Sequence, residues 1–189
     1  MLTSTLRELN SHAQSMRKIV AGAFARGQLS GRSFPDRAGN VIDIVIGDSL
    51  DEIASRSRFA TRLPGVLGQY FETWVKSGDD VYALQKAYLH LLFGSQRETA
   101  EDIVFVHTEP QIAAIGADAK QRRIARWRSG PHLHIKASRF GLGRCHLHLD
   151  TCNEPCPALK SLSNYRKQIQ MMIEMLADEL ELYFDPAQA

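Results

Sequence analysis

Apolar residues recur every three or four positions in four stretches of the chain, which is the spacing of an amphipathic helix. These stretches are residues 3–26, 63–76, 79–94 and 161–184. We therefore predict N-terminal, central and C-terminal helices that each bury one face in a common core. A shorter helix is predicted over residues 49–58, where a Ser-x-x-Glu capping box begins it. Contacts between subunits through these apolar stripes are a second interpretation.

Strand patterns fall between the predicted helices. Residues 41–46, VIDIVI, are β-branched except for Asp43, which we expect to face solvent rather than a binding site. Residues 99–107 contain the apolar run IVFV, which predicts a strand that ends at His107. His107 would lie near the histidines of residues 130–150 if the two segments pair in the same sheet. Residues 31–40, which contain proline and glycine, are predicted to form a polar loop.

The most informative stretch is GPHLHIKASRFGLGRCHLHLD, residues 130–150, which holds four of the seven histidines in two His-x-His pairs. Polar and apolar positions alternate on both sides of a glycine-containing loop, and this period of two predicts a β-hairpin. The two apolar sets must share the buried face, which fixes the parity of the register. The buried set would be Leu133, Ile135, Leu147 and Leu149. The simplest allowed register has three pairs: His132 with His148, His134 with His146, and Lys136 with Arg144.

Four imidazoles on one face of a hairpin form a candidate metal site. Cβ atoms of directly opposed residues lie roughly 4.5–5.5 Å apart, and neutral imidazole is a ligand for zinc, copper, iron and nickel. The predicted ligands, with zinc as the first expectation for the metal, are His132, His134, His146, His148 and Asp150. The carboxylate of Asp150 would either bind the ion or orient one of its ligands.

Two other interpretations of the hairpin remain open. Without a metal, His134, His146 and Lys136 are candidates for acid–base catalysis, and Lys136 and Arg144 are candidates for binding a phosphate group. Alternatively, the histidines lie on the solvated face of an amphipathic hairpin that has no site. His90 falls within a predicted helix and is interpreted as a surface or core histidine rather than a ligand.

The charge of the chain is small overall but unevenly distributed. The net charge is +2, yet residues 120–144 hold eight Lys or Arg and no acid, while residues 174–185 hold five acids and no Lys or Arg. The basic region includes residues 122–128, RRIARWR, which we expect to form a strand before the hairpin. A non-catalytic module that binds nucleic acid or a protein partner through residues 120–144 is therefore the alternative function. Its aromatic residues, Trp127 and Phe140, are few for base stacking.

Length and composition exclude several classes of protein. The length of 189 residues suits a single globular domain, residues 1–189. The chain has no apolar run long enough to span a membrane and no apolar leader, so we expect a cytoplasmic protein without a membrane partner. Three cysteines do not indicate a disulfide framework, and Cys152 and Cys156 are expected to be free thiols in a loop. The chain also lacks a Walker A loop, an H-E-x-x-H helix and a G-x-S-x-G elbow.

These patterns together predict an α+β fold. An antiparallel sheet that contains the histidine hairpin would be packed on one face by the helices, and the opposite face would carry the histidines. The function we expect is metal binding, in the service of hydrolysis of a phosphate ester or another small phosphate-bearing molecule. The identity of the substrate and the oligomeric state do not follow from the sequence.

Overall fold

A computed structural model of the chain describes residues 2–50, 57–93, 101–108, 118–121, 131–135, 145–148 and 157–184. Two long helices are described, α1 (Leu6–Phe24) and α3 (Leu162–Phe184). The strands are β1 (Thr3–Thr5), β2 (Ser30–Pro35), β3 (Val41–Gly47), β4 (Phe59–Ala60), β5 (Val66–Gly78), β6 (Val81–Phe93), β7 (Glu101–Thr108), β8 (His132–Ile135) and β9 (Cys145–His148). A short 3-10 helix, Pro157–Lys160, precedes α3. The fold is mixed α+β, as predicted.

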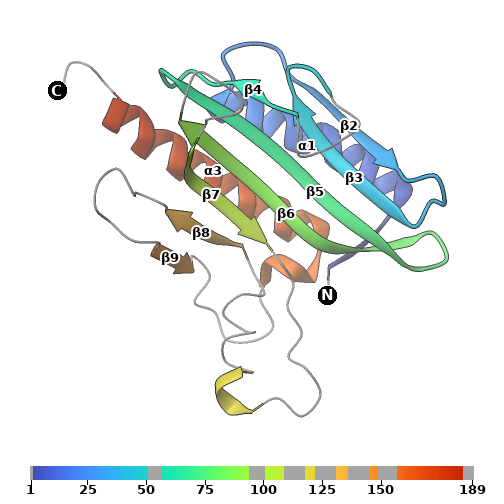
Figure 1. The fold of residues 1–189 in the computed structure, drawn as a ribbon. Helices are drawn as coiled ribbons and strands as arrows, with labels where there is room; N and C mark the ends of the chain where they lie inside the picture. Colours follow the sequence, from blue (N-terminus) through green and yellow to red (C-terminus); the bar gives the residue numbers. More distant parts are fainter. Residues whose placement is uncertain are drawn as a thin grey trace.

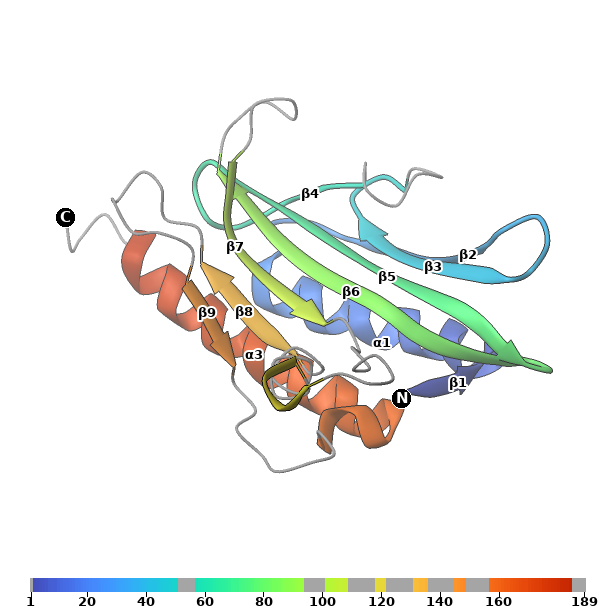
Figure 2. The same ribbon diagram turned by 60° about the horizontal axis from the view of Figure 1, so that its bottom comes forward.

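The strands form one antiparallel sheet with a simple order. Its path is β2-β3-β5-β6-β7-β8-β9 (Figure 1). Off this path, β1 pairs with β6 and β4 pairs with β5. Both α1 and α3 lie on the same face of this sheet (Figure 2). We call the face toward α1 and α3 the inner face and the opposite one the outer face.

The two central helices predicted from the sequence are wrong. Residues 63–76 and 79–94 instead supply the two longest strands, β5 and β6, which pair with each other along their length. They are joined by a tight turn in which Asp80 has a left-handed backbone, with φ of 51°. Residues 31–40, predicted as a loop, instead supply most of β2. The predicted helix over residues 49–58 falls mostly outside the described residues, and its last two residues, Ser57 and Arg58, are not helical.

The predictions for α1, α3 and β3 are confirmed. Thr5 caps α1 with a capping box, because Glu8 N–H donates to Thr5 Oγ1 at 3.3 Å and Thr5 N–H donates to Glu8 Oε2 at 3.0 Å. The hydrogen bond from the backbone of Thr5, followed by those from the side chains of Ser4 and Thr5, lowers the pKa of Glu8. At the start of α3, Asn164 N–H donates to Ser161 Oγ at 3.1 Å.

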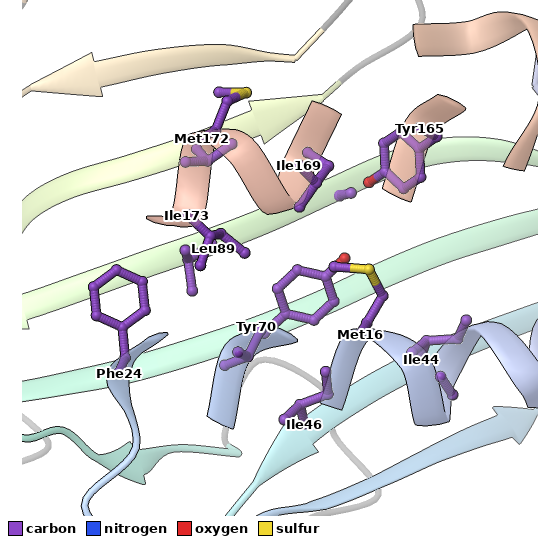
Figure 3. Close-up of a cluster of buried hydrophobic side chains, with 14 of the residues drawn as sticks. Met16, Phe24, Ile44, Ile46, Tyr70, Leu89, Tyr165, Ile169, Met172 and Ile173 are labelled. Atoms are coloured by element: carbon purple, nitrogen blue, oxygen red, sulfur yellow. The ribbon is translucent and has the colours of Figure 1, made fainter. Parts of the chain in front are cut away.

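The core lies between the inner face of the sheet and the two helices (Figure 3). The helices contribute Met16 and Phe24 from α1 and Tyr165, Ile169, Met172 and Ile173 from α3. The strands contribute Ile44 and Ile46 from β3, Tyr70 from β5 and Leu89 from β6. Full burial of each such side chain stabilises the fold by roughly 1.5–3 kcal/mol. This packing fixes which residues of β3, β5 and β6 face inward. No helix among the described residues combines the length and the apolar composition needed to cross a membrane.

Candidate functional site

The outer face of the sheet carries two rows of residues that run across neighbouring strands. The first row is Phe71, Tyr88, His107, His132 and His148, on β5 to β9. The second row is Gln69, His90, Phe105, His134 and His146, on the same five strands. Six of the seven histidines therefore occupy neighbouring register positions. We call these six residues the histidine face: His90, His107, His132, His134, His146 and His148.

The assignment of these rows to the outer face follows from their neighbours. Leu89 pairs with Val106, and Val106 pairs with Leu133, and all three are buried in the core with the helices. Successive residues of a strand point to opposite faces. The residues next to these three in each strand, which include His107 and His132, therefore belong to the outer face.

The rings of the first row are packed against each other. Tyr88 and His107 have ring centroids 4.0 Å apart with planes tilted by 30°. His107 and His132 have centroids 5.1 Å apart and planes tilted by 47°. At the other end of the row, Phe71 and Tyr88 have centroids 4.9 Å apart. A continuous line of rings thus joins β5 to β8.

His132 lies in a buried position. Only 3% of its surface is exposed, and the next residue along β8, Leu133, is exposed by 3% on the inner face. His107 is partly buried. The interpretation of the histidines as a solvated surface is therefore wrong for His132. A buried imidazole needs partners for its nitrogen atoms, since burying a polar group without one is unfavourable.

The structure gives the backbone positions of the four hairpin histidines but describes the side chain of His132 alone among them. The backbone register between β8 and β9 sets His132 opposite His148 and His134 opposite His146, as the alternation predicted. The side chains of His134, His146 and His148 lie outside the described part of the structure, so the convergence of the four rings stays a prediction. Among the side chains that are described, no group of three His, Cys, Asp or Glu residues is arranged to hold a metal ion.

The remaining predicted site residues fall outside the described residues altogether. They are Lys136, Arg144, Asp150, Cys152 and Cys156. The predicted strand over residues 122–128 and most of the basic region 120–144 fall outside them as well. The predictions of anion binding and of nucleic-acid binding therefore remain predictions.

His90 and His107 join the histidine face through tertiary structure. His90 belongs to β6 and not to a helix, and its ring centroid lies 5.5 Å from that of Tyr88. His107 pairs with His132, because β7 pairs directly with β8. The sequence signal for His90 was the alternation of Lys86, Tyr88 and His90 with apolar residues. That signal is ambiguous because the same residues also fit the helical spacing.

A second polar cluster lies on the inner face, and the sequence did not reveal it. His12 of α1 places Nε2 2.9 and 3.0 Å from the two carboxylate oxygens of Glu72 on β5. Trp74 Nε1 donates to the same carboxylate at 2.7 Å, and Tyr70 Oη donates to it as well. Both His12 and Glu72 are fully buried. We call these four residues the Glu72 cluster.

The Glu72 cluster holds a charge inside the core. Burial by itself would raise the pKa of Glu72, but the charge of His12 and the hydrogen bonds from His12, Tyr70 and Trp74 outweigh it and lower the pKa. Burial, and then the neighbouring carboxylate of Glu72, raise the pKa of Tyr70 and of Tyr165 well above the ordinary value. With no exposed surface on His12 or Glu72, this cluster is suited to fixing α1 on the sheet rather than to meeting a substrate.

Two open grooves lie away from both clusters. One, of about 610 Å³, is lined by Arg26 and by residues 60–67 around the start of β5. The other, of about 470 Å³, lies between α1 and α3 and carries charges of both signs, such as Lys18 and Glu174. Neither groove is lined by a histidine.

Comparison with models of known protein families, with curated proteins and with solved structures finds no match for this chain. The class that the fold itself defines is an α+β protein in which two helices cover one face of an antiparallel sheet.

Proposed function

We propose that the protein binds a divalent transition-metal ion, with zinc as the first candidate, through histidines of β8 and β9. The observation that carries the proposal is the register of these strands, which opposes His132 to His148 and His134 to His146. Asp150, which follows β9 by two residues, is proposed either to bind the ion or to orient a ligand.

The spacing of the strand positions suits a small tetrahedral site. Opposed residues have Cβ atoms roughly 4.5–5.5 Å apart, and residues two apart on one strand are separated by about 6.6 Å. An imidazole that binds zinc at about 2.0–2.1 Å spans such separations together with a neighbouring imidazole. Three of the four hairpin histidines would fill three positions of the ion and leave the fourth for water or substrate.

Hydrolysis of a phosphate ester is the chemistry proposed for the open position. A zinc ion held by these histidines would lower the pKa of a water molecule at the open position to about 7, and that water would then be available as a nucleophile at neutral pH. Lys136 and Arg144, which flank the hairpin loop in the sequence, are proposed to hold the phosphate group. This step depends on the metal, whereas metal binding does not depend on it.

The first experiment measures metal content of the purified full-length chain and of the double variant His134→Ala/His146→Ala by elemental analysis, before and after incubation with zinc chloride. We expect about one equivalent of zinc in the unmodified protein and its loss in the folded double variant. Far-UV circular dichroism checks that the variant is folded. Stoichiometric zinc retained by the folded variant, or no zinc in the unmodified protein after incubation, contradicts the proposal.

A second experiment tests the hydrolytic step by itself. The zinc-loaded protein and the chelator-treated protein are compared for release of p-nitrophenol from p-nitrophenyl phosphate. We expect turnover only with zinc, and turnover that falls in Lys136→Ala and Arg144→Ala while the bound zinc remains. Full zinc occupancy without turnover would leave metal binding intact and reject the proposal for this ester.

A further inference from the structure

The strand β7 brings a histidine to β8 from the side opposite to β9. His107 pairs with His132, and His132 in turn pairs with His148, so His132 is the central member of three histidines on adjacent strands. We infer that His107 is a metal ligand together with His132, so that the ion lies over β7 and β8 as well as over the hairpin. This inference rests on the proposed metal binding and extends it to a residue outside the hairpin.

The separation of the two rings fits a shared ion. Two imidazoles that bind one tetrahedral zinc, each with a Zn–N distance of about 2.0–2.1 Å, have ring centroids about 5 Å apart. The centroids of His107 and His132 are 5.1 Å apart. Aromatic rings that only pack against each other also lie at such distances. Zinc binding by variants therefore has to distinguish a shared ion from ring packing alone.

The ring of Tyr88 packs against the ring of His107 on the side away from β8. The rings of Tyr88 and His107 are 4.0 Å apart and tilted by only 30°, which is a stacked arrangement, whereas the rings of His107 and His132 are further apart and more steeply tilted. Tyr88 therefore acts as a positioning residue that restricts the ring of His107 on the side away from β8. A ligand whose ring is already restricted loses less conformational entropy when it binds the ion.

The buried position of His132 limits the access of water to its ring. Its 3% exposure means that water contributes little to its environment. One further ligand would come from a neighbour of His132 in the register, either His134 two residues along β8 or His148 opposite on β9, so that the fourth position of the ion stays open. His90 is not part of this set, because Phe105 of β7 stands between it and His134 in the second row.

The histidine face therefore contains its own matched control. His107→Phe and His90→Phe each replace a histidine of the outer face by an aromatic ring that preserves packing against Tyr88. Zinc affinity of the full-length chain is measured by competition with a chromophoric chelator, beside the double variant His134→Ala/His146→Ala. We expect His107→Phe to weaken zinc binding by at least about tenfold, since even the loss of a group that only orients a ligand costs 10–100-fold. His90→Phe should stay within about twofold of the unmodified protein.

A spectroscopic readout separates loss of a ligand from a general disturbance. Cobalt(II) is used in place of zinc, and its visible d–d absorption reports the ligand number and geometry. We expect a changed spectrum in His107→Phe and an unchanged one in His90→Phe. If His107→Phe does not fold by circular dichroism, His107→Asn replaces it as a smaller polar variant with the same expected loss.

The outcomes distinguish the two proposals. Zinc affinity and cobalt spectrum unchanged in His107→Phe, with zinc lost in the hairpin double variant, overturn the role of His107 and leave the hairpin site standing. Zinc absent from the unmodified protein overturns both. Equal weakening in His107→Phe and His90→Phe also overturns the inference, because it would show a general effect of the outer face.

Discussion

His12 of α1 and Glu72 of β5 form a buried contact between helix and sheet, with Nε2 of His12 2.9 and 3.0 Å from the two carboxylate oxygens. Neither side chain has any exposed surface. The carboxylate also accepts hydrogen bonds from Tyr70 and Trp74, which are its neighbours on the inner face of β5. Because a buried charge is tolerated only when it is paired and hydrogen-bonded, these donors form one unit that fixes the position of α1 on the sheet.

Removal of one partner of this pair should destabilise the protein strongly. His12→Ala leaves the Glu72 carboxylate buried without its imidazole partner, and the loss of one member of a buried pair typically costs about 3–5 kcal/mol. We expect a loss of this size in the free energy of unfolding, measured by urea denaturation. The double variant His12→Leu/Glu72→Leu replaces both partners by apolar side chains and should be closer in stability to the unmodified protein than His12→Ala is.

A surface ion pair supplies the control for this experiment. Nη2 of Arg62 lies 3.1 Å from Oε1 of Glu181, and the two side chains are 48% and 52% exposed. Exposed pairs contribute about 0.2–1 kcal/mol because water and salt screen them, so Glu181→Ala should be nearly neutral. A cost for His12→Ala no greater than that for Glu181→Ala would show that the buried pair does not anchor α1.

The Glu72 cluster also predicts the response to acid. The pKa of Glu72 is lowered from its ordinary value of 4.5. Since the folded-state pKa lies below the unfolded-state pKa, the unfolded chain takes up a proton first as the pH falls. The stabilisation by Glu72 is therefore complete above about pH 4.5 and is lost as the pH falls below that value toward its folded-state pKa.

This linkage is measured by urea denaturation at several pH values between neutral and strongly acidic solution. We expect the stability difference between the unmodified protein and Glu72→Gln to shrink as the pH falls below about 4.5. His12 and Tyr165, from the two helices, face the same carboxylate with Tyr70 and Trp74, so all four stay unchanged in the comparison. Parallel curves for the two proteins across this range would contradict the assignment.

The same glutamate explains why the sequence of β5 predicts a helix. A strand that buries one face normally alternates apolar and polar residues, but the inner face of β5 carries Glu72 between Tyr70 and Trp74, and its outer face carries the apolar Phe71. The alternation is thereby concealed, and the apolar residues fall at helical spacing. The buried carboxylate is stabilised by His12 of the packed helix together with Tyr70 and Trp74, and its contact with His12 spans 60 positions of sequence.

In β6, by contrast, the pattern of period two was present but ambiguous. Lys86, Tyr88 and His90 alternate with inner-face residues such as Leu89. The strand is 13 residues long and its pairing register shifts between Leu91 and Leu92, which disturbs a strict alternation. Strands of this length are uncommon, and the length favoured the wrong assignment to a helix.

The hairpin register was predictable because it depends only on local parity. Leu133 is buried on the inner face, and a slip by one residue would expose it, so His132 must pair within the register that the structure has. The neighbours of the hairpin were not predictable in the same way. The pairing of β7 with β8, which brings His107 to His132, is a tertiary relationship between segments separated by residues without a clear pattern.

Gly68 of β5 lies against Phe59 of β4, where the sheet has little room for a larger side chain. A Cβ atom at Gly68 would lie 2.1 Å from Cζ of Phe59, whose ring is 1% exposed and so has little room to move. Gly68→Ala should therefore cost about 1–3 kcal/mol of unfolding free energy through overpacking. Gly22, in the exposed part of α1, has no atom within 4 Å of an added Cβ, so Gly22→Ala should stabilise the protein by about 0.5–1 kcal/mol. Both values are obtained from urea denaturation, and the double variant Gly68→Ala/Phe59→Leu should recover part of the loss by giving the new methyl group space. A Gly68→Ala variant as stable as Gly22→Ala would mean that the ring of Phe59 does not pack on β5.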